Sequence, residues 1–119
     1  MNIEEFRDYC LRKKGVEETF PFDEVTLVFK VMGKMFALIG LDSDHFSVNL
    51  KCDPERAIEL RESHPEIQPG WHMSKKHWNT VSFEGALDDD FLLELIDHSY
   101  DLVVAKLPKK VREALSKQE

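Results

Sequence analysis

The sequence predicts an α+β domain in which an antiparallel sheet carries helices packed on one face. Apolar residues recur at helical spacing near both ends and in the middle of the chain, and between these segments they alternate with polar residues. The resulting order is helix, three strands, helix, one or two strands, helix and helix. This order favours an antiparallel sheet with one covered face and one open face.

Composition agrees with a single soluble domain spanning residues 1–119. Lys and Arg number 16 and Asp and Glu 23, so the net charge is −7. A chain of 119 residues can bury a core without a metal or disulfide, and 42% hydrophobic content excludes disorder. No apolar stretch approaches the roughly 18 residues of a membrane span, and the N-terminus does not look like a signal peptide. Cys10 and Cys52 form no C-x-x-C pair, so we expect reduced thiols and a cytoplasmic location.

The first predicted helix starts at Asn2, which can cap it, with Glu5 three residues later. The basic run 12–14 suits the negative end of the helix dipole, and Gly15 can close the helix. The segment 17–22 that follows is predicted to be a loop.

Three strands are predicted next, forming a meander. Residues 25–32 alternate between apolar and other side chains, and Gly33-Lys34 separates them from the apolar run 35–41. After a turn at 42–45, residues 46–51 alternate cleanly.

Asp53, a capping residue followed by proline, predicts a second helix that must end near Pro65. Residues 66–70 are predicted to be a loop, and residues 77–83 a strand. The acid run 88–90 opens the longest helix, and Pro108 ends it or starts a final short helix. The apolar stripe of the long helix consists of Phe91, Leu92, Leu95, Ile96, Ser99, Leu102 and Val103.

Strand alternation also predicts which side chains lie on the open face of the sheet. These are Thr26, Lys30, Ser47, Asn49, Lys51, Trp78, Thr80 and Ser82. The predicted face carries lysines, hydroxyl groups and an aromatic ring, but no acid.

The segment 67–83 has no acidic residue, yet it contains cations interleaved with aromatic rings. These residues are Trp71, His72, Lys75, Lys76, His77 and Trp78. Nucleic-acid surfaces use cations against phosphates and rings against bases. The alternative is that both tryptophans pack in the core or at its rim and that the lysines are merely solvated.

A net charge of −7 argues against tight, sequence-independent DNA binding, although a local basic patch remains compatible with it. Residues 106–119 hold 5 bases and 2 acids. These bases either add phosphate contacts or form the solvated face of a terminal helix.

No metal site, cofactor or catalytic centre is expected. His72 and His77 lie five residues apart without an implied third ligand. The chain has no Gly-x-Ser-x-Gly elbow and no phosphate-cradling glycine loop. We therefore expect a protein that is not an enzyme.

Several short motifs together, in this order and spacing, resemble the YjbR/MmcQ family of small bacterial proteins. They are Thr19-Phe20-Pro21-Phe22-Asp23, Lys30-Val31 with Gly33-Lys34-Met35-Phe36, Gly70-Trp71-His72-Met73, His77-Trp78-Asn79, and the ending from Ser99-Tyr100 to Leu107-Pro108. The resemblance implies a fold like that of CyaY, the bacterial frataxin homologue, with the order α-β-β-β-α-β-α. It also implies a proposed role in DNA binding through a double-wing arrangement, and it brings no catalytic residues.

Our hypothesis from the sequence is weak nucleic-acid binding through the open face and residues 71–79. Phosphates would meet Lys30, Lys34, Lys51, Lys75 and Lys76; Trp78 would stack on bases; and His72, His77 and Asn79 would make polar contacts. Protonated histidines would strengthen binding below about pH 6.5.

Two alternatives stay open. The frataxin-like resemblance implies metal (iron) or protein-partner binding at the acidic first helix and the loop after it. The acids concerned are Glu4, Glu5, Asp8, Glu17, Glu18 and Asp23. The other alternative is an adaptor whose open sheet face docks a protein.

Overall fold

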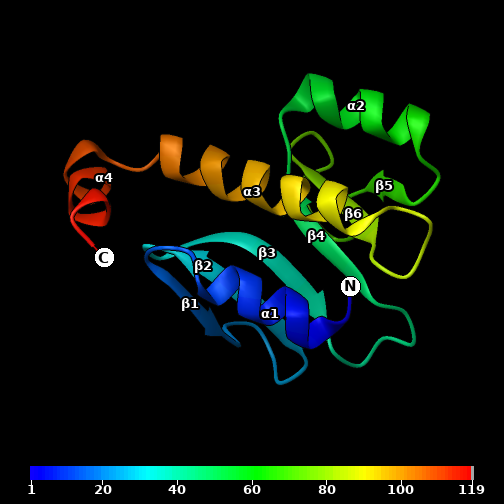
Figure 1. Cartoon of the computed structure of the whole chain (residues 1–119), viewed down its shortest axis with the longest axis horizontal. Coiled ribbons are helices and arrows are strands. Elements are labelled where there is room, and N and C mark those ends of the chain that lie inside the picture. The colour runs from blue at the N-terminus through cyan, green and yellow to red at the C-terminus, as the bar shows by residue number, and fades with distance from the viewer. Residues whose placement is uncertain (119) are drawn as a thin grey trace.

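The computed structural model describes residues 1–118, so Glu119, the last residue of the predicted domain, lies outside the described residues. The elements are α1 (Ile3–Leu11), β1 (Val16–Thr19), β2 (Thr26–Val31), β3 (Lys34–Gly40), β4 (Ser47–Lys51), α2 (Pro54–Ser63), β5 (Ile67–Pro69), β6 (Trp78–Ser82), α3 (Asp89–Ala105) and α4 (Lys109–Ser116) (Figure 1).

The strands form one antiparallel sheet in the order β1-β2-β3-β4-β6-β5. Helix α3 packs against β2, β3 and β4, whereas α1 packs against β1 and α2 against β5 (Figure 1). The predicted α+β class, with an antiparallel sheet and helices packed on it, is confirmed.

Two strands fall in or overlap segments predicted to be loops: β1 overlaps residues 17–22 and β5 lies within residues 66–70. Both are edge strands, of 4 and 3 residues. Strand β1 reads Val-Glu-Glu-Thr and β5 ends in proline, so neither shows the apolar alternation that marks a buried strand. The observed order therefore has these two strands in addition to the predicted ones.

Local capping explains where the helices begin. Asn2 accepts a hydrogen bond from the backbone of Glu5, whose side chain bonds back to the Asn2 N–H, completing a capping box. Asp53 and Asp88 cap α2 and α3 through the backbone N–H groups three residues on. These predicted starts are confirmed.

The main core lies between the helices and one face of the sheet. Phe6 of α1 is fully buried and meets Phe29 and Phe83 edge to face, with ring centroids 5.4 Å apart in both pairs. Ile96 and Leu92 of α3 are buried on the same side. Burial of these large rings and aliphatic side chains holds α1 and α3 against the sheet.

Ser99 is a fully buried polar residue of α3 that bridges two strands. Its hydroxyl donates to the Phe36 carbonyl and accepts from the Lys51 backbone N–H at 2.9 Å. The β2–β3 register shifts between Phe29 and Lys30, so Phe36 lies opposite no partner residue. The serine therefore satisfies backbone groups that the sheet leaves free.

Ser99→Ala should lower the free energy of unfolding by about 2 kcal/mol, because two buried backbone groups lose their partner. Urea denaturation measures the change. Ser47→Ala, a half-buried serine of β4 on the opposite face, is the control and should change stability by less than about 0.5 kcal/mol. Equal effects of the two variants would contradict the bridging role.

His98 links α3 to the start of α2. Its Nε2 accepts a hydrogen bond from the Asp53 backbone N–H at 3.1 Å, which requires the neutral ring. Burial, and next the charge of Arg56, lower the pKa of His98 below its usual value.

Stability should consequently fall as the pH drops from about 8 through the unfolded-state imidazole pKa of about 6.5, since the unfolded chain binds the proton more readily. Urea midpoints across this range should decline less steeply for His98→Gln than for the wild type. A His98→Gln profile parallel to that of the wild type would refute the linkage.

Candidate nucleic-acid interface

The face of the sheet opposite the main core is organised in rows set by strand pairing. One row runs Glu17, Lys30 and Met35 across β1, β2 and β3, and Lys51 of β4 pairs with Trp78 of β6. The next runs Thr19, Val28, Leu38, Asn49, Thr80 and Gln68. The predicted residues Thr26, Ser47 and Ser82 continue the same alternation.

The prediction that this face carries no acid is wrong. Strand β1 pairs Glu17 with Lys30, so the carboxylate and the ammonium group extend from directly opposite positions on the same face. The sequence of this segment predicts a loop, so it gives no sign of the neighbour that reduces the positive charge around Lys30.

This face is also less open than expected, because residues 70–77 fold over part of it. Val28, Leu38 and Trp78 form a second small core, and the partly buried Met35 and Met73 pack against it. Met73 comes from the folded-over segment, which we call the 70–77 loop. The loop therefore shields apolar side chains that would otherwise contact water.

Hydrogen bonds to the sheet fix the first part of the loop. The Trp71 backbone N–H donates to Thr80 Oγ1 at 2.9 Å, and Asn49 Nδ2 donates to the Trp71 carbonyl at 3.3 Å. The Thr80 hydroxyl also donates to Asn49 Oδ1. Gly70 allows the close approach, since a Cβ there would lie 2.8 Å from Cβ of Trp78.

Arg61 of α2 fixes the end of the loop. Its Nε donates to Asn79 Oδ1 at 2.7 Å, and its Nη2 donates to the carbonyls of Lys75 and Trp78. Arg61 is not among the residues predicted for the interface. Its contacts depend on how α2 crosses β6, a relation for which the local sequence carries no signal.

Trp78 is only 7% exposed, so the prediction that it stacks on bases is wrong for this conformation. Its ring packs on Val28 and Leu38, and Lys51 Nζ lies 5.9 Å from the ring centroid. Asn79 is 2% exposed and is engaged by Arg61, which removes it from the predicted polar contacts.

Trp71 is the accessible aromatic residue of the interface, with 69% of its surface exposed. The exposed His72 meets it edge to face at 4.9 Å and adopts a positive φ of 57°. Lys75 Nζ donates to the Gly70 carbonyl at 3.0 Å across the loop. Lys76 is exposed and His77 is half-buried.

The other predicted lysines lie at the same end of the sheet. Lys30 pairs with Met35, Lys51 pairs with Trp78, and Lys34 is exposed at the β2–β3 turn. Burial, and next the charge of Lys106, lower the pKa of Lys51. An anion bound here would raise the pKa of Lys51 again, because a nearby negative charge favours the ammonium form.

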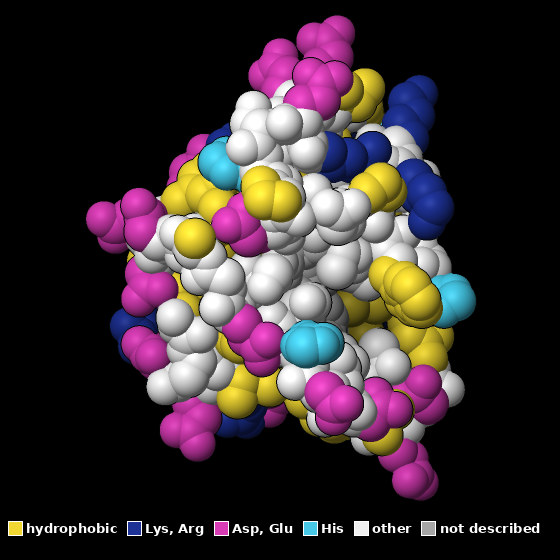
Figure 2. Space-filling model, turned by 90° about the vertical axis from the view of Figure 1, so that its right-hand side faces the viewer, with side chains coloured by type: hydrophobic (Ala, Val, Ile, Leu, Met, Phe, Trp, Pro, Cys, Tyr) yellow, Lys and Arg dark blue, Asp and Glu magenta, His cyan; other side chains and the backbone are white. Residues whose placement is uncertain are grey.

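Acidic side chains dominate other parts of the surface. On the side shown in Figure 2, basic side chains gather along the upper right edge, whereas acidic side chains occupy much of the remaining outline. On this side of the molecule, basic and acidic side chains are therefore separated, although the net charge of the chain is −7.

Several acids of the proposed metal alternative have structural partners. Glu18 forms an ion pair with Arg7, which lowers the Glu18 pKa, and Asp23 accepts from the backbone of Val25 and Thr26. Within residues 1–118, no three His, Cys, Asp or Glu side chains gather as a metal site would require. The helices of this described part are too short or too polar to span a bilayer.

These features define a small α+β protein with a helix-covered sheet and a loop folded over the opposite face. The family model YjbR matches residues 11–102, and the chain belongs to this family. YjbR of Escherichia coli K12 is 36% identical over 115 residues, covering 97% of this chain and 98% of that protein. YyaQ of Bacillus subtilis 168 is 35% identical over 75 residues, or 60% of this chain and 62% of YyaQ.

Two solved structures share the architecture. The crystal structure of Deinococcus radiodurans DR2400, with a DUF419 domain, superposes with a TM-score of 0.90 at 43% identity, covering 97% of this chain and 88% of that one. A crystal structure from Pseudomonas syringae has a TM-score of 0.73 at 32% identity, covering 86% of this chain and 98% of the other.

Substitution of the two tryptophans should change the stability of the protein to very different extents. Trp78→Ala should lower the free energy of unfolding by about 3–5 kcal/mol because it empties the second core. Trp71→Ala should change it by less than about 0.5 kcal/mol because that ring is solvated. Urea denaturation measures both values, and acrylamide should quench the fluorescence of Trp71 more strongly than that of Trp78. Similar stability losses would contradict this assignment.

Proposed function

We propose that this protein binds nucleic acid weakly, with DNA as the first candidate, through the 70–77 loop and the adjoining lysine-bearing end of the sheet. Trp71 replaces Trp78 as the stacking residue. The observation that carries this proposal is an exposed tryptophan held in place beside lysines in an acid-free segment.

Preorganisation supports the role of Trp71. Its backbone is hydrogen-bonded to Thr80 and Asn49 on both sides, so the loop loses little further freedom when a base stacks on the ring. Stacking on an exposed ring needs an unpaired base, which favours single strands over duplexes.

The lysines supply the matching charge. Lys51 lies two residues beyond Asn49 on β4 and on the same face, so it is close to the backbone of Trp71. Lys75 and Lys76 extend from the loop itself, and Lys30 and Lys34 come from the neighbouring strands. Because only these few lysines would neutralise phosphates, binding should be weak, and it should weaken further as salt is added.

We also propose that the protein is not an enzyme and that it is located in the cytoplasm. Its strands and helices would have a CyaY-like, or frataxin-like, arrangement. Both cysteines are buried free thiols, and burial raises the pKa of Cys10 to about 12 and that of Cys52 to about 11. Thiols that resist ionisation make poor nucleophiles, which supports a role without catalysis.

Fluorescence anisotropy with labelled single- and double-stranded DNA tests the proposal at low and physiological salt. Trp71→Ala should weaken single-strand binding roughly tenfold, since stacking contributes about 1–3 kcal/mol per base. Lys75→Ala/Lys76→Ala should reduce the slope of log affinity against log salt by about 1.4, because two phosphate contacts are lost.

Arg12→Ala/Lys14→Ala is the charge-matched control, because it removes two exposed cations at the end of α1. It should leave the slope unchanged if binding is confined to the proposed surface. Binding that is absent at low salt, or that depends equally on Arg12 and Lys14, would reject the proposal.

A further inference from the structure

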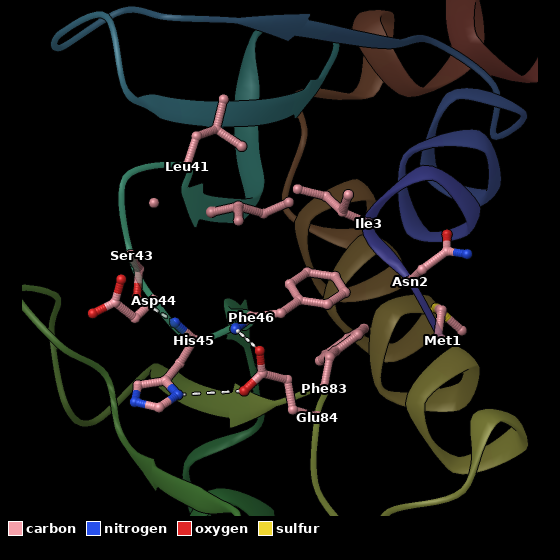
Figure 3. Close-up of a pocket in the computed structure, with 12 residues that line it drawn as sticks. Met1, Asn2, Ile3, Leu41, Ser43, Asp44, His45, Phe46, Phe83 and Glu84 are labelled. Carbon is pink, nitrogen blue, oxygen red and sulfur yellow. Dashed lines mark hydrogen bonds and ion pairs between the residues drawn. The ribbon is translucent and has the colours of Figure 1, made fainter.

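An apolar groove runs between α1 and the β3–β4 loop, away from the 70–77 loop. It consists of two hollows of about 400 and 300 Å³, both lined by Ile3 and Leu41. Figure 3 shows Ile3 and Leu41 on opposite sides of the larger hollow, with the rings of Phe46 and Phe83 on the same side as Ile3. Phe20 and Leu27 line the smaller hollow.

Exposed apolar side chains concentrate around this groove. Of the seven exposed large hydrophobic residues within 1–118, Ile3, Phe20 and Leu41 line it. Phe22 and Val25 follow in the segment between β1 and β2, and the Val25 carbonyl accepts from the Leu41 N–H at 2.7 Å. A contiguous apolar surface of this kind marks an interaction site more often than isolated exposed residues do.

The charged groups of the groove give it a negative character. Its acidic lining residues are Glu4, Glu18, Asp44 and Glu84. Arg7 is the basic lining side chain and is already paired with Glu18, while His45 Nδ1 lies 3.4 Å from Glu84 Oε2 (Figure 3). The carboxylates at either end therefore favour a cationic occupant.

We propose that this groove docks a cationic, amphipathic peptide segment of a partner protein. Apolar side chains of the segment would enter the two hollows, and its lysines or arginines would meet Glu4 and Asp44. This chain's own basic helix α4 is a poor occupant, because its Leu115 is 5% exposed and packs beside Gly15 in the same molecule. A second copy therefore has no free apolar stripe on α4 to insert.

The test titrates the ¹⁵N-labelled protein with a short amphipathic peptide of leucine and lysine while amide shifts are recorded. Shifts should be confined to α1, the segment between β1 and β2, and the β3–β4 loop. Two matched peptides, one with glutamate for lysine and one with serine for leucine, should bind at least about tenfold more weakly, a difference of about 1.4 kcal/mol.

Variants of the protein test whether the peptide binds in the groove. Leu41→Ser and Glu4→Gln/Asp44→Asn should each weaken the leucine–lysine peptide about tenfold. Ile58→Ser and Glu55→Gln/Glu59→Gln make equivalent changes at exposed positions of α2 and should have no effect.

Two results would overturn the proposal. One is equal binding of the glutamate peptide or equal sensitivity to the α2 variants. The other is concentration-dependent dimerisation through the groove without peptide binding, which would assign the surface to a second copy. Neither result bears on the nucleic-acid surface, because Trp71 and the lysines are unchanged in these variants.

Discussion

The longest helix is held on the sheet by apolar burial, and within that contact the buried hydroxyl of Ser99 fixes where the helix sits. It joins α3 to the Phe36 carbonyl at the β2–β3 irregularity and to the Lys51 N–H at the end of β4. An apolar residue here would leave both backbone groups unpaired in the core. Apolar burial decides which face of the sheet the helices cover, and these two bonds fix the position of α3 on that face, so the opposite face receives the 70–77 loop.

The packing of helices on one face of the sheet explains why the opposite face has few buried apolar side chains. Most large apolar side chains face α1 and α3, so the opposite face retains only Val28, Leu38 and Trp78 as a buried group. That group is too small to be shielded by strands alone, and Met73 of the 70–77 loop packs against it. Covering Trp78 in this way turns Trp71 outward. The burial of Trp78 and the exposure of Trp71 are therefore both consequences of the conformation of the 70–77 loop.

The sequence predicted the features that local rules determine. Capping at Asn2, Asp53 and Asp88 and the alternation of β2 and β4 depend on neighbours in sequence, and these elements are present. The burial of Trp78 and the exposure of Trp71 depend on which side of a returning loop faces the sheet, and the pairing of Glu17 with Lys30 depends on an edge strand without a hydrophobic pattern. Arg61 likewise acts only through the tertiary placement of α2.

The net charge of −7 is a poor guide to what this protein binds, because dissolved salt screens the charges on one part of the surface from those on another. The β3–β4 loop, which lines the groove, leads into the first residue of β4, and Lys51 is the last residue of that strand. Four residue steps of about 3.3 Å place these two positions roughly 13 Å apart. The Debye length at physiological ionic strength is about 8 Å, so acids at the groove only weakly reduce the potential around the lysines. A cationic peptide and a phosphate chain can consequently occupy opposite ends of the same sheet without competing for charge.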